Sequence, residues 1–246
     1  MTAGLPKVMR VEPAPRTFAI AIAYSRLPLP MTRADQMTVA HLISFLAARG
    51  HAVDFYALDN GEEISAEHRA WIDEVCREVQ VFPHGPVRRV MGVVAGLLRG
   101  RPLQVGWFSN AAQTRAVRVG LQKVDIGYSY YIRSAETMRG FGRSRNRETG
   151  PVTFLAMQLS QALNTRRMAE HFRNLKEKLL YAVETRLVQN YEPRVWSDFT
   201  RTVLIGQQDV DEIASACRDR GLPEIDNVVF GPHGVDVDRF APRTDI

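Results

Sequence analysis

Cysteine is scarce in this chain, and long apolar segments are missing from it. Its 246 residues include two cysteines, Cys76 and Cys217, which lie far apart and lack the spacing of metal ligands. A disulfide framework is not indicated, so a reducing cytoplasm is the expected compartment. No apolar run reaches the roughly 18–20 residues of a spanning helix, and residues 1–15 lack the apolar core of a signal peptide. Membrane contact is therefore expected to be peripheral.

The short motifs that mark several common enzyme classes are also missing. The sequence has no Walker-type phosphate loop, no HExxH zinc signature, no GxSxG nucleophile elbow and no CxxC pair. The glycines at 140 and 142 are too few and wrongly placed for a dinucleotide fingerprint. We therefore expect neither a metal nor a tightly bound cofactor.

Composition and charge are those of an ordinary globular protein. Hydrophobic residues make up 45% and charged residues 24% of the chain, and the net charge is +5. A moderately basic surface suits phosphorylated substrates or anionic lipid, and it equally serves solubility. No nucleic-acid partner is expected.

Apolar, strand-like segments alternate with helical ones. Residues 17–24 are apolar throughout, as in a strand buried on both faces of a parallel sheet. Gly50 ends a helix over 34–49, and a strand over 51–58 completes a β-α-β unit. Further strands are expected at 78–83, 124–129, 152–157, 202–206 and 228–230, and further helices at 65–76, 87–99, 109–121, 165–190 and 209–220. The alternation predicts an α/β fold: a Rossmann-like, doubly wound, mostly parallel sheet with helices on both faces.

Two segments resemble a known family. Pro232, His233, Gly234, Val235, Asp236, Phe240 and Pro242 follow the last expected strand. They resemble the "P-N-G-V-D-x-x-x-F-x-P" segment of retaining GT-B glycosyltransferases of group 1, the family 4-like type, with histidine in place of the usual asparagine. The stretch 41–53 resembles the family's "H-L-x-x-x-L-A-x-R-G-H-x-V". Both of its histidines, His41 and His51, are expected to be structural because they fall within packed elements.

The resemblance covers about residues 17–242 and implies the N-terminal, acceptor-side half of a GT-B fold. Such enzymes move a sugar from a nucleotide-sugar donor to a saccharide or lipid-linked acceptor, as in polysaccharide biosynthesis, and need no metal. Residues 1–16 are expected to be a flexible lead. Residues 231–246 are expected to begin an interdomain linker with a hinge at His233, Gly234 and Asp236.

In the family the donor binds to a second, C-terminal domain, which these 246 residues do not contain. The chain alone is therefore expected to be incomplete for catalysis. One alternative is a noncatalytic acceptor-binding half-domain that works with a separate C-terminal subunit. Another is a nucleotide-binding Rossmann protein of a different class.

Ligands of open parallel sheets bind beyond the carboxyl ends of the strands, which selects the loops there as candidate sites. In the first loop, Arg26 and Asp35 match the family's "R-L-P-x-P-x-x-x-G-D", but Ala34 replaces the glycine. A side chain there blocks the closest approach of backbone to phosphate. Arg26 and Arg33 are then the groups that would supply positive charge. The alternative is a proline-stiffened loop with solvated arginines.

Later loops supply one more cation and several amides. Arg133 follows the fourth expected strand, and its guanidinium suits a phosphate or a sugar diol; the alternative is a surface ion pair. Gln158 and Gln161 stand where the family often has acids, so they and Asn164 are candidate ligands of sugar hydroxyls but not general bases. Gln207 is a further candidate, and the aspartates at 209 and 211 are expected to cap the next helix. The resemblance identifies no catalytic residue.

Residues 87–101 carry arginines at both ends of an apolar middle. A helix of this kind can lie on an anionic membrane surface. It can equally be an ordinary helix that covers the sheet.

Overall fold

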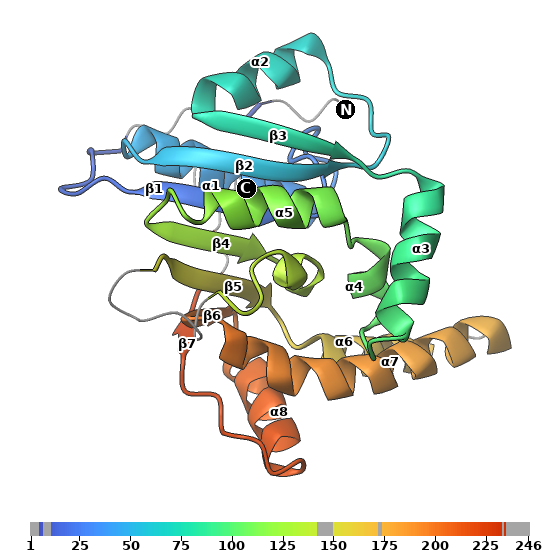
Figure 1. Ribbon diagram of the computed structural model, residues 1–246. Helices are drawn as coiled ribbons and strands as arrows, with labels where there is room; N and C mark the ends of the chain where they lie inside the picture. The colour runs from blue at the N-terminus through green and yellow to red at the C-terminus, as the bar shows by residue number, and fades with distance from the viewer. Residues whose placement is uncertain (1–4, 7–10, 142–149, 172–173, 233, 235–246) are drawn as a thin grey trace, which may run out of the picture.

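The computed structural model describes residues 5–6, 11–141, 150–171, 174–232 and 234. Within them, seven strands form one sheet in the order β3-β2-β1-β4-β5-β6-β7, and every pairing is parallel (Figure 1). The strands are β1 (Ala19–Tyr24), β2 (Ala52–Asp59), β3 (Glu78–Pro83), β4 (Ile126–Tyr130), β5 (Val152–Gln158), β6 (Arg201–Leu204) and β7 (Val228–Phe230). The chain order reverses between β1 and β4, which makes that boundary the topological switch point.

Helices cover both faces of the sheet. They are α1 (Ala34–Ala48), α2 (Ala66–Val75), α3 (Pro86–Leu97), α4 (Leu103–Trp107), α5 (Ala111–Gly120), α6 (Gln161–His171), α7 (Leu175–Val195) and α8 (Gln207–Arg218), with 3-10 turns η1 (Ile132–Thr137) and η2 (Trp196–Asp198). Alternate residues of a strand point to opposite faces. Ile20 and Ile22 of β1 accordingly join the core under α1 and α2, whereas Ala21 and Ala23 join the core under α5, α7 and α8. The predicted doubly wound α/β fold is confirmed.

Local packing explains two features of residues 41–53. The ring of His51 is structural, since its Nδ1 accepts a hydrogen bond from the Phe18 amide at 3.1 Å. Gly50 adopts a φ of 85°, a conformation that glycine allows without strain, and it ends α1 directly before β2. Both observations fit a packing role for residues 41–53.

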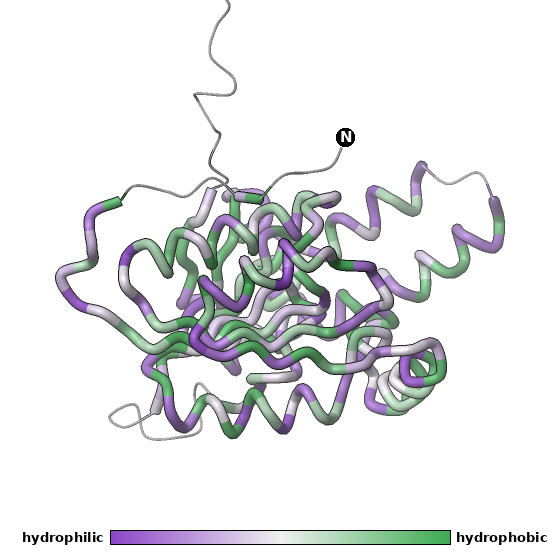
Figure 2. The backbone as a smooth tube through the Cα atoms, turned by 90° about the horizontal axis from the view of Figure 1, so that it is seen from above, coloured by the Kyte–Doolittle hydropathy of each residue, from purple (hydrophilic) through white to green (hydrophobic). Residues whose placement is uncertain are grey.

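The prediction of one long helix over 165–190 is wrong. Two helices, α6 and α7, stand there as a hairpin that projects from the body of the molecule (Figure 2). The Asn174 side chain caps α7 by accepting a hydrogen bond from the Lys176 amide at 3.0 Å, which is a helix start signal inside the predicted span. The short helix α4 was also missed.

Glycines allow α3 to approach α4 closely. A methyl group on Gly106 of α4 would lie 2.8 Å from the carbonyl oxygen of Gly92 and 2.9 Å from the Cα atom of Val93, both in α3. Real Cβ atoms do not pack that tightly, so only glycine fits. The contact fixes α3 at one end of the sheet, beside the carboxyl ends of the strands (Figure 1).

Several predictions about the two ends of the chain are not tested by the structure. The lead over 1–16 and the linker over 231–246 stay predictions, because half of the lead and most of the linker, with His233 and Asp236, lie outside the described residues. Gly234 is described and exposed, without regular structure. None of the helices in the described part of the chain has the length and apolarity to cross a membrane.

Candidate functional site

A pocket of about 370 Å³ lies at the carboxyl ends of β1, β4 and β5, at the switch point of the sheet. We call it the polar pocket. Its walls include Arg26, Arg33, Ala34, Asp35, Thr38, Tyr130, Tyr131, Arg133, Gln158 and Ile205. The sequence predicted five of these as site residues: both loop arginines, the aspartate, Arg133 and Gln158. The fold therefore brings together residues that are up to 132 positions apart in the chain.

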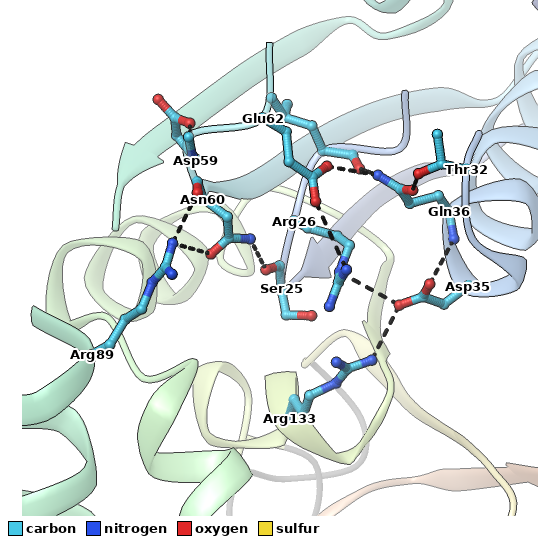
Figure 3. Close-up of polar contacts among 12 residues, drawn as sticks. Ser25, Arg26, Thr32, Asp35, Gln36, Asp59, Asn60, Glu62, Arg89 and Arg133 are labelled. Atoms are coloured by element: carbon cyan, nitrogen blue, oxygen red, sulfur yellow. Dashed lines mark hydrogen bonds and ion pairs between the residues drawn. The ribbon is translucent and has the colours of Figure 1, made fainter. Parts of the chain in front are cut away.

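Two arginines converge on one carboxylate in this pocket (Figure 3). Arg133 donates from Nη2 to Oδ2 of Asp35 at 3.1 Å, and Arg26 Nε lies 3.5 Å from the same oxygen. Only 8% of the Arg26 side chain and 14% of the Arg133 side chain are exposed. The solvated-loop alternative is therefore wrong for Arg26, although Arg33 is exposed. Arg133 does form an ion pair, but it is largely buried and not on the open surface.

Aromatic rings cover the faces of these guanidinium groups. Arg133 lies 4.4 Å from the ring centre of Tyr131 and 4.9 Å from that of Phe108, and Arg26 lies 5.7 Å from Phe108. Such stacking leaves the N–H donors free along the edge of the guanidinium plane. Burial lowers the pKa of Arg133, and the neighbouring charge of Arg26 lowers it further. The pocket is thus short of negative charge.

The loop that carries Arg26 is held in place by hydrogen bonds to neighbouring elements. The buried amide of Gln36 donates to the Leu27 carbonyl at 3.1 Å and to Glu62 at 2.8 Å, and Asn60 donates to the Ser25 carbonyl at 2.9 Å. Glu62 also lies 3.9 Å from Arg26. The loop is therefore preorganised before any ligand arrives. This support could not be predicted from the sequence, since Gln36 looks like any polar residue in a first helical turn.

Two residues of the polar pocket have an unusual backbone. Tyr131 has a φ of 69° and Gln158 a φ of 70°, although neither is glycine. Such conformations cost roughly 1–3 kcal/mol and cluster at functional sites. The strain aims the Tyr131 ring at Arg133 and points toward a role for this pocket.

A second cavity of about 710 Å³ adjoins the first, and we call it the apolar pocket. It lies between α3 and α4 on one side and the α6–α7 hairpin on the other. Its apolar walls are Val93, Leu103, Trp107, Phe108, Met168 and Leu180. Tyr131 and Arg133 line both pockets. Sequence reasoning missed this cavity, because it predicted neither α4 nor the break between α6 and α7, and these three helices supply most of its walls.

The predicted amides divide between the pockets. Gln158 faces the polar pocket, whereas Gln161 and Asn164 line the apolar one. Gln161 donates to the Tyr131 hydroxyl at 2.5 Å, which ties α6 to the wall that the pockets share. Gln207 lines neither pocket; it is exposed and donates to Asp211 at 2.8 Å.

Asp209 does not cap α8 as expected. Its carboxylate accepts a hydrogen bond from the Ser160 amide at 2.8 Å, while Gly206 stands at the N-cap position. The predicted capping role is wrong because α8 begins at Gln207, two residues earlier than expected, which places Asp209 inside the first turn and Gly206 at the N-cap. Asp209 thus orders the segment that leads into α6.

Two buried glutamates of α7 hold the walls of the apolar pocket. Glu184 accepts hydrogen bonds from the first amides of α4, Leu103 at 2.6 Å and Gln104 at 3.2 Å. Glu192 accepts from the Gln161 amide at 2.6 Å and the Ser160 hydroxyl at 2.8 Å, at the start of α6. Carboxylates suit helix N-termini electrostatically. Burial nevertheless dominates, raising the pKa of Glu184 and raising that of Glu192 to about 7.

The carboxylates that line these pockets are engaged in contacts within the protein. Among the described residues that line them, the carboxylates are Asp35, which pairs with two arginines, and Glu184, which caps α4. Neither has the unengaged, poised oxygen of a general base. The described part of the chain also has no cluster of three or more histidine, cysteine or acidic side chains suited to a metal.

Comparison with known proteins adds no relative. No protein-family model matches the chain, and no curated protein matches it. The fold and the pocket geometry therefore carry the functional argument.

Proposed function

We propose that this chain is the acceptor-binding domain of a GT-B glycosyltransferase that transfers a sugar from a nucleotide-sugar donor to a saccharide or lipid-linked acceptor. The observation that carries the proposal is the polar pocket at the switch point of the sheet, where ligands of such folds bind. Its cations, Arg26 and Arg133, are residues that the family resemblance singled out. The resemblance assigns the donor to a second domain.

Each side chain has a definite part in this proposal. Arg26 and Arg133 hold an anionic or diol group of the acceptor in the plane of their guanidinium edges. Gln158 and Asn164 offer amides to hydroxyl groups. Glu184 and Glu192 keep α4 and α6 in place, so that the acceptor meets a fixed wall.

The donor affinity of residues 1–246 tests the assignment of roles. Nucleotide sugars with uridine, guanosine and adenosine diphosphate would be titrated into the chain by calorimetry. The proposal predicts no saturable binding below millimolar concentration, because the donor site belongs to the second domain. Micromolar binding would instead support a nucleotide-binding Rossmann protein of another class.

A noncatalytic role is the second candidate, and one observation favours it. Both carboxylates that line the pockets are already engaged, and Gln158 and Gln161 stand where the family often has acids. An acceptor-binding half-domain that works with a separate subunit needs no acid there. Acceptor binding by the protein as its gene encodes it, with no turnover of any nucleotide sugar unless a partner subunit is added, would identify this case.

We also propose peripheral contact between α3 and an anionic membrane at the cytoplasmic face. Six large apolar side chains of this region are exposed: Val87, Val90, Met91, Val94, Leu97 and Leu98. A groove of about 1400 Å³ between α3 and α5 runs beside them and is lined by Arg88, Arg99, Arg101, Arg115 and Arg118. An apolar stripe flanked by cations is the pattern of an interfacial helix.

A further inference from the structure

We propose that the acceptor is an amphiphile whose phosphate-like anion lies between Arg26 and Arg133, and whose apolar chain fills the apolar pocket. The word acceptor rests on the function proposed above. The binding itself rests on the geometry of the two pockets alone. Three features support it: unused donors, uncovered apolar walls and the junction between the two.

The two guanidinium groups have N–H donors that form no hydrogen bond within the described residues. Each guanidinium carries five N–H bonds, yet Arg133 makes one hydrogen bond, to Asp35, among the described residues. The Arg26 guanidinium pairs with Asp35 and Glu62 only at the longer distances of 3.5 and 3.9 Å in that part of the chain. Unpaired buried donors are costly, and those of a charged group most of all. An anion with several oxygens, such as a phosphate monoester, would satisfy both arginines at once.

The apolar pocket offers walls that folding alone leaves uncovered. Trp107, Met168 and Leu180 line it, and each stays substantially exposed to solvent. Its volume of about 710 Å³ is within the range of cavities that bury a small organic ligand. An alkyl or prenyl chain would cover these side chains, whereas a sugar ring would leave them wet.

The junction fixes the order of the two parts of the ligand. Arg133 and Tyr131 belong to both pockets, and the Phe108 ring contacts both arginines while lining the apolar pocket. A chain that leaves the anion at Arg133 therefore enters the apolar pocket directly. A free phosphate would use one pocket, and a neutral glycoside would leave the arginine donors unpaired.

Binding of three probes to the intact chain tests this inference. Decyl phosphate, decyl maltoside and inorganic phosphate would be titrated below micellar concentrations, with the fluorescence of Trp107 as reporter and Trp107→Phe to identify its signal. Decyl phosphate is expected to bind at least about tenfold more tightly than either other probe. Equal affinity for decyl phosphate and inorganic phosphate would show that the apolar chain contributes nothing to binding. Equal affinity for the two decyl compounds would show that the anion contributes nothing. Either result would overturn the inference.

Variants of the protein then test which pocket binds the anion and which binds the alkyl chain. Arg133→Gln should weaken decyl phosphate by about tenfold or more and leave decyl maltoside unchanged, and the exposed Leu180→Ser should weaken both decyl compounds. Arg69→Gln, at an exposed arginine of α2 that lines neither pocket nor the groove beside α3, is the matched control and should change nothing. If Arg133→Gln fails to fold, the comparison of the three probes with the wild type and the Leu180→Ser variant still test the inference. These titrations contain no nucleotide sugar, so they test binding alone. Tight decyl phosphate binding, together with no sugar transfer in a separate assay that supplies nucleotide sugars, would contradict only the proposed function.

Discussion

At the scale of single residues, the Arg26–Asp35–Arg133 contact concentrates charge where the sheet reverses its strand order. Removing the carboxylate with Asp35→Asn would leave two buried arginines without their shared partner. Glu62, 3.9 Å from Arg26, would be the remaining carboxylate contact of that arginine among the described residues. We expect the free energy of unfolding to fall by about 3 kcal/mol, since breaking a buried ion pair leaves uncompensated charge. Urea denaturation measures it. Arg33→Gln, on the exposed side of the same loop, should change stability by less than about 0.5 kcal/mol; similar losses for both variants would mean that burial of the arginines is unimportant.

Glu192 predicts a pH dependence of stability. Its pKa is about 7 in the folded protein, against an ordinary value of 4.5. A raised carboxyl pKa favours folding when the group is protonated, so its contribution is complete below pH 4.5 and is lost as pH rises through 7. The shift corresponds to roughly 3 kcal/mol. Urea titrations between pH 4.5 and 8 should show this loss in the wild type and not in Glu192→Gln; parallel pH profiles would contradict the assignment.

The residue scale also shows what the sequence could predict about the site. Arg26, Asp35 and Arg133 were found because they follow buried strands whose carboxyl ends must share one edge. Gln36 and Glu192 were not found, because a polar residue in a helix looks solvated until the tertiary structure buries it. Burial of a polar group is a property of the neighbours it acquires and not of local sequence.

At the scale of elements, the contact between α3 and α4 shapes the apolar pocket. Gly106→Ala would place a methyl group 2.8 Å from the Gly92 carbonyl oxygen and force the helices apart. We expect a loss of about 1–3 kcal/mol, the usual cost of overpacking, together with weaker binding of decyl phosphate. Thermal unfolding and the probe titration measure the two effects. A methyl group on Gly150 meets nothing within 4 Å, so Gly150→Ala should be neutral.

The exposed stripe of α3 makes a second prediction at this scale. Val94 is 53% and Leu98 84% exposed, so a charge there should not disturb the fold. Val94→Glu with Leu98→Glu should abolish sedimentation with vesicles that contain phosphatidylglycerol, by removing apolar contact and adding repulsion. Phe45→Glu, at an exposed apolar residue of α1, is the control. Equal vesicle binding by all three proteins would contradict membrane contact through α3.

Strands were predicted more faithfully than helices, for a physical reason. A strand buried on both faces must be apolar throughout, as residues 19–24 are. The α6–α7 hairpin has no such pattern, because its outward faces are polar and its boundary depends on the Asn174 cap alone. The apolar pocket escaped for the same reason: its walls come from helices whose apolar residues resemble those of any covering helix.

At the scale of the whole molecule, the sheet forms the polar pocket and the α6–α7 hairpin helps to enclose the apolar pocket. The sheet presents Arg26, Asp35 and Arg133 at its switch point, and α4, α6 and α7 enclose the neighbouring cavity. The exposed stripe of α3 lies on the same helix that contributes Val93 to that cavity. A membrane under α3 would thus bring the apolar end of an acceptor close to its pocket.

Sugar transfer by the protein as its gene encodes it tests the central claim most directly. Nucleotide sugars would be offered with a decyl phosphate-linked acceptor to the wild type, to Arg133→Gln and to the exposed control Arg69→Gln. The account predicts that Arg133→Gln raises the KM for the acceptor by about tenfold or more, leaves the KM for the donor unchanged, and that the control behaves as the wild type. A change confined to the donor KM would contradict an acceptor site at this pocket. No transfer from any nucleotide sugar by the wild type would contradict the glycosyltransferase itself.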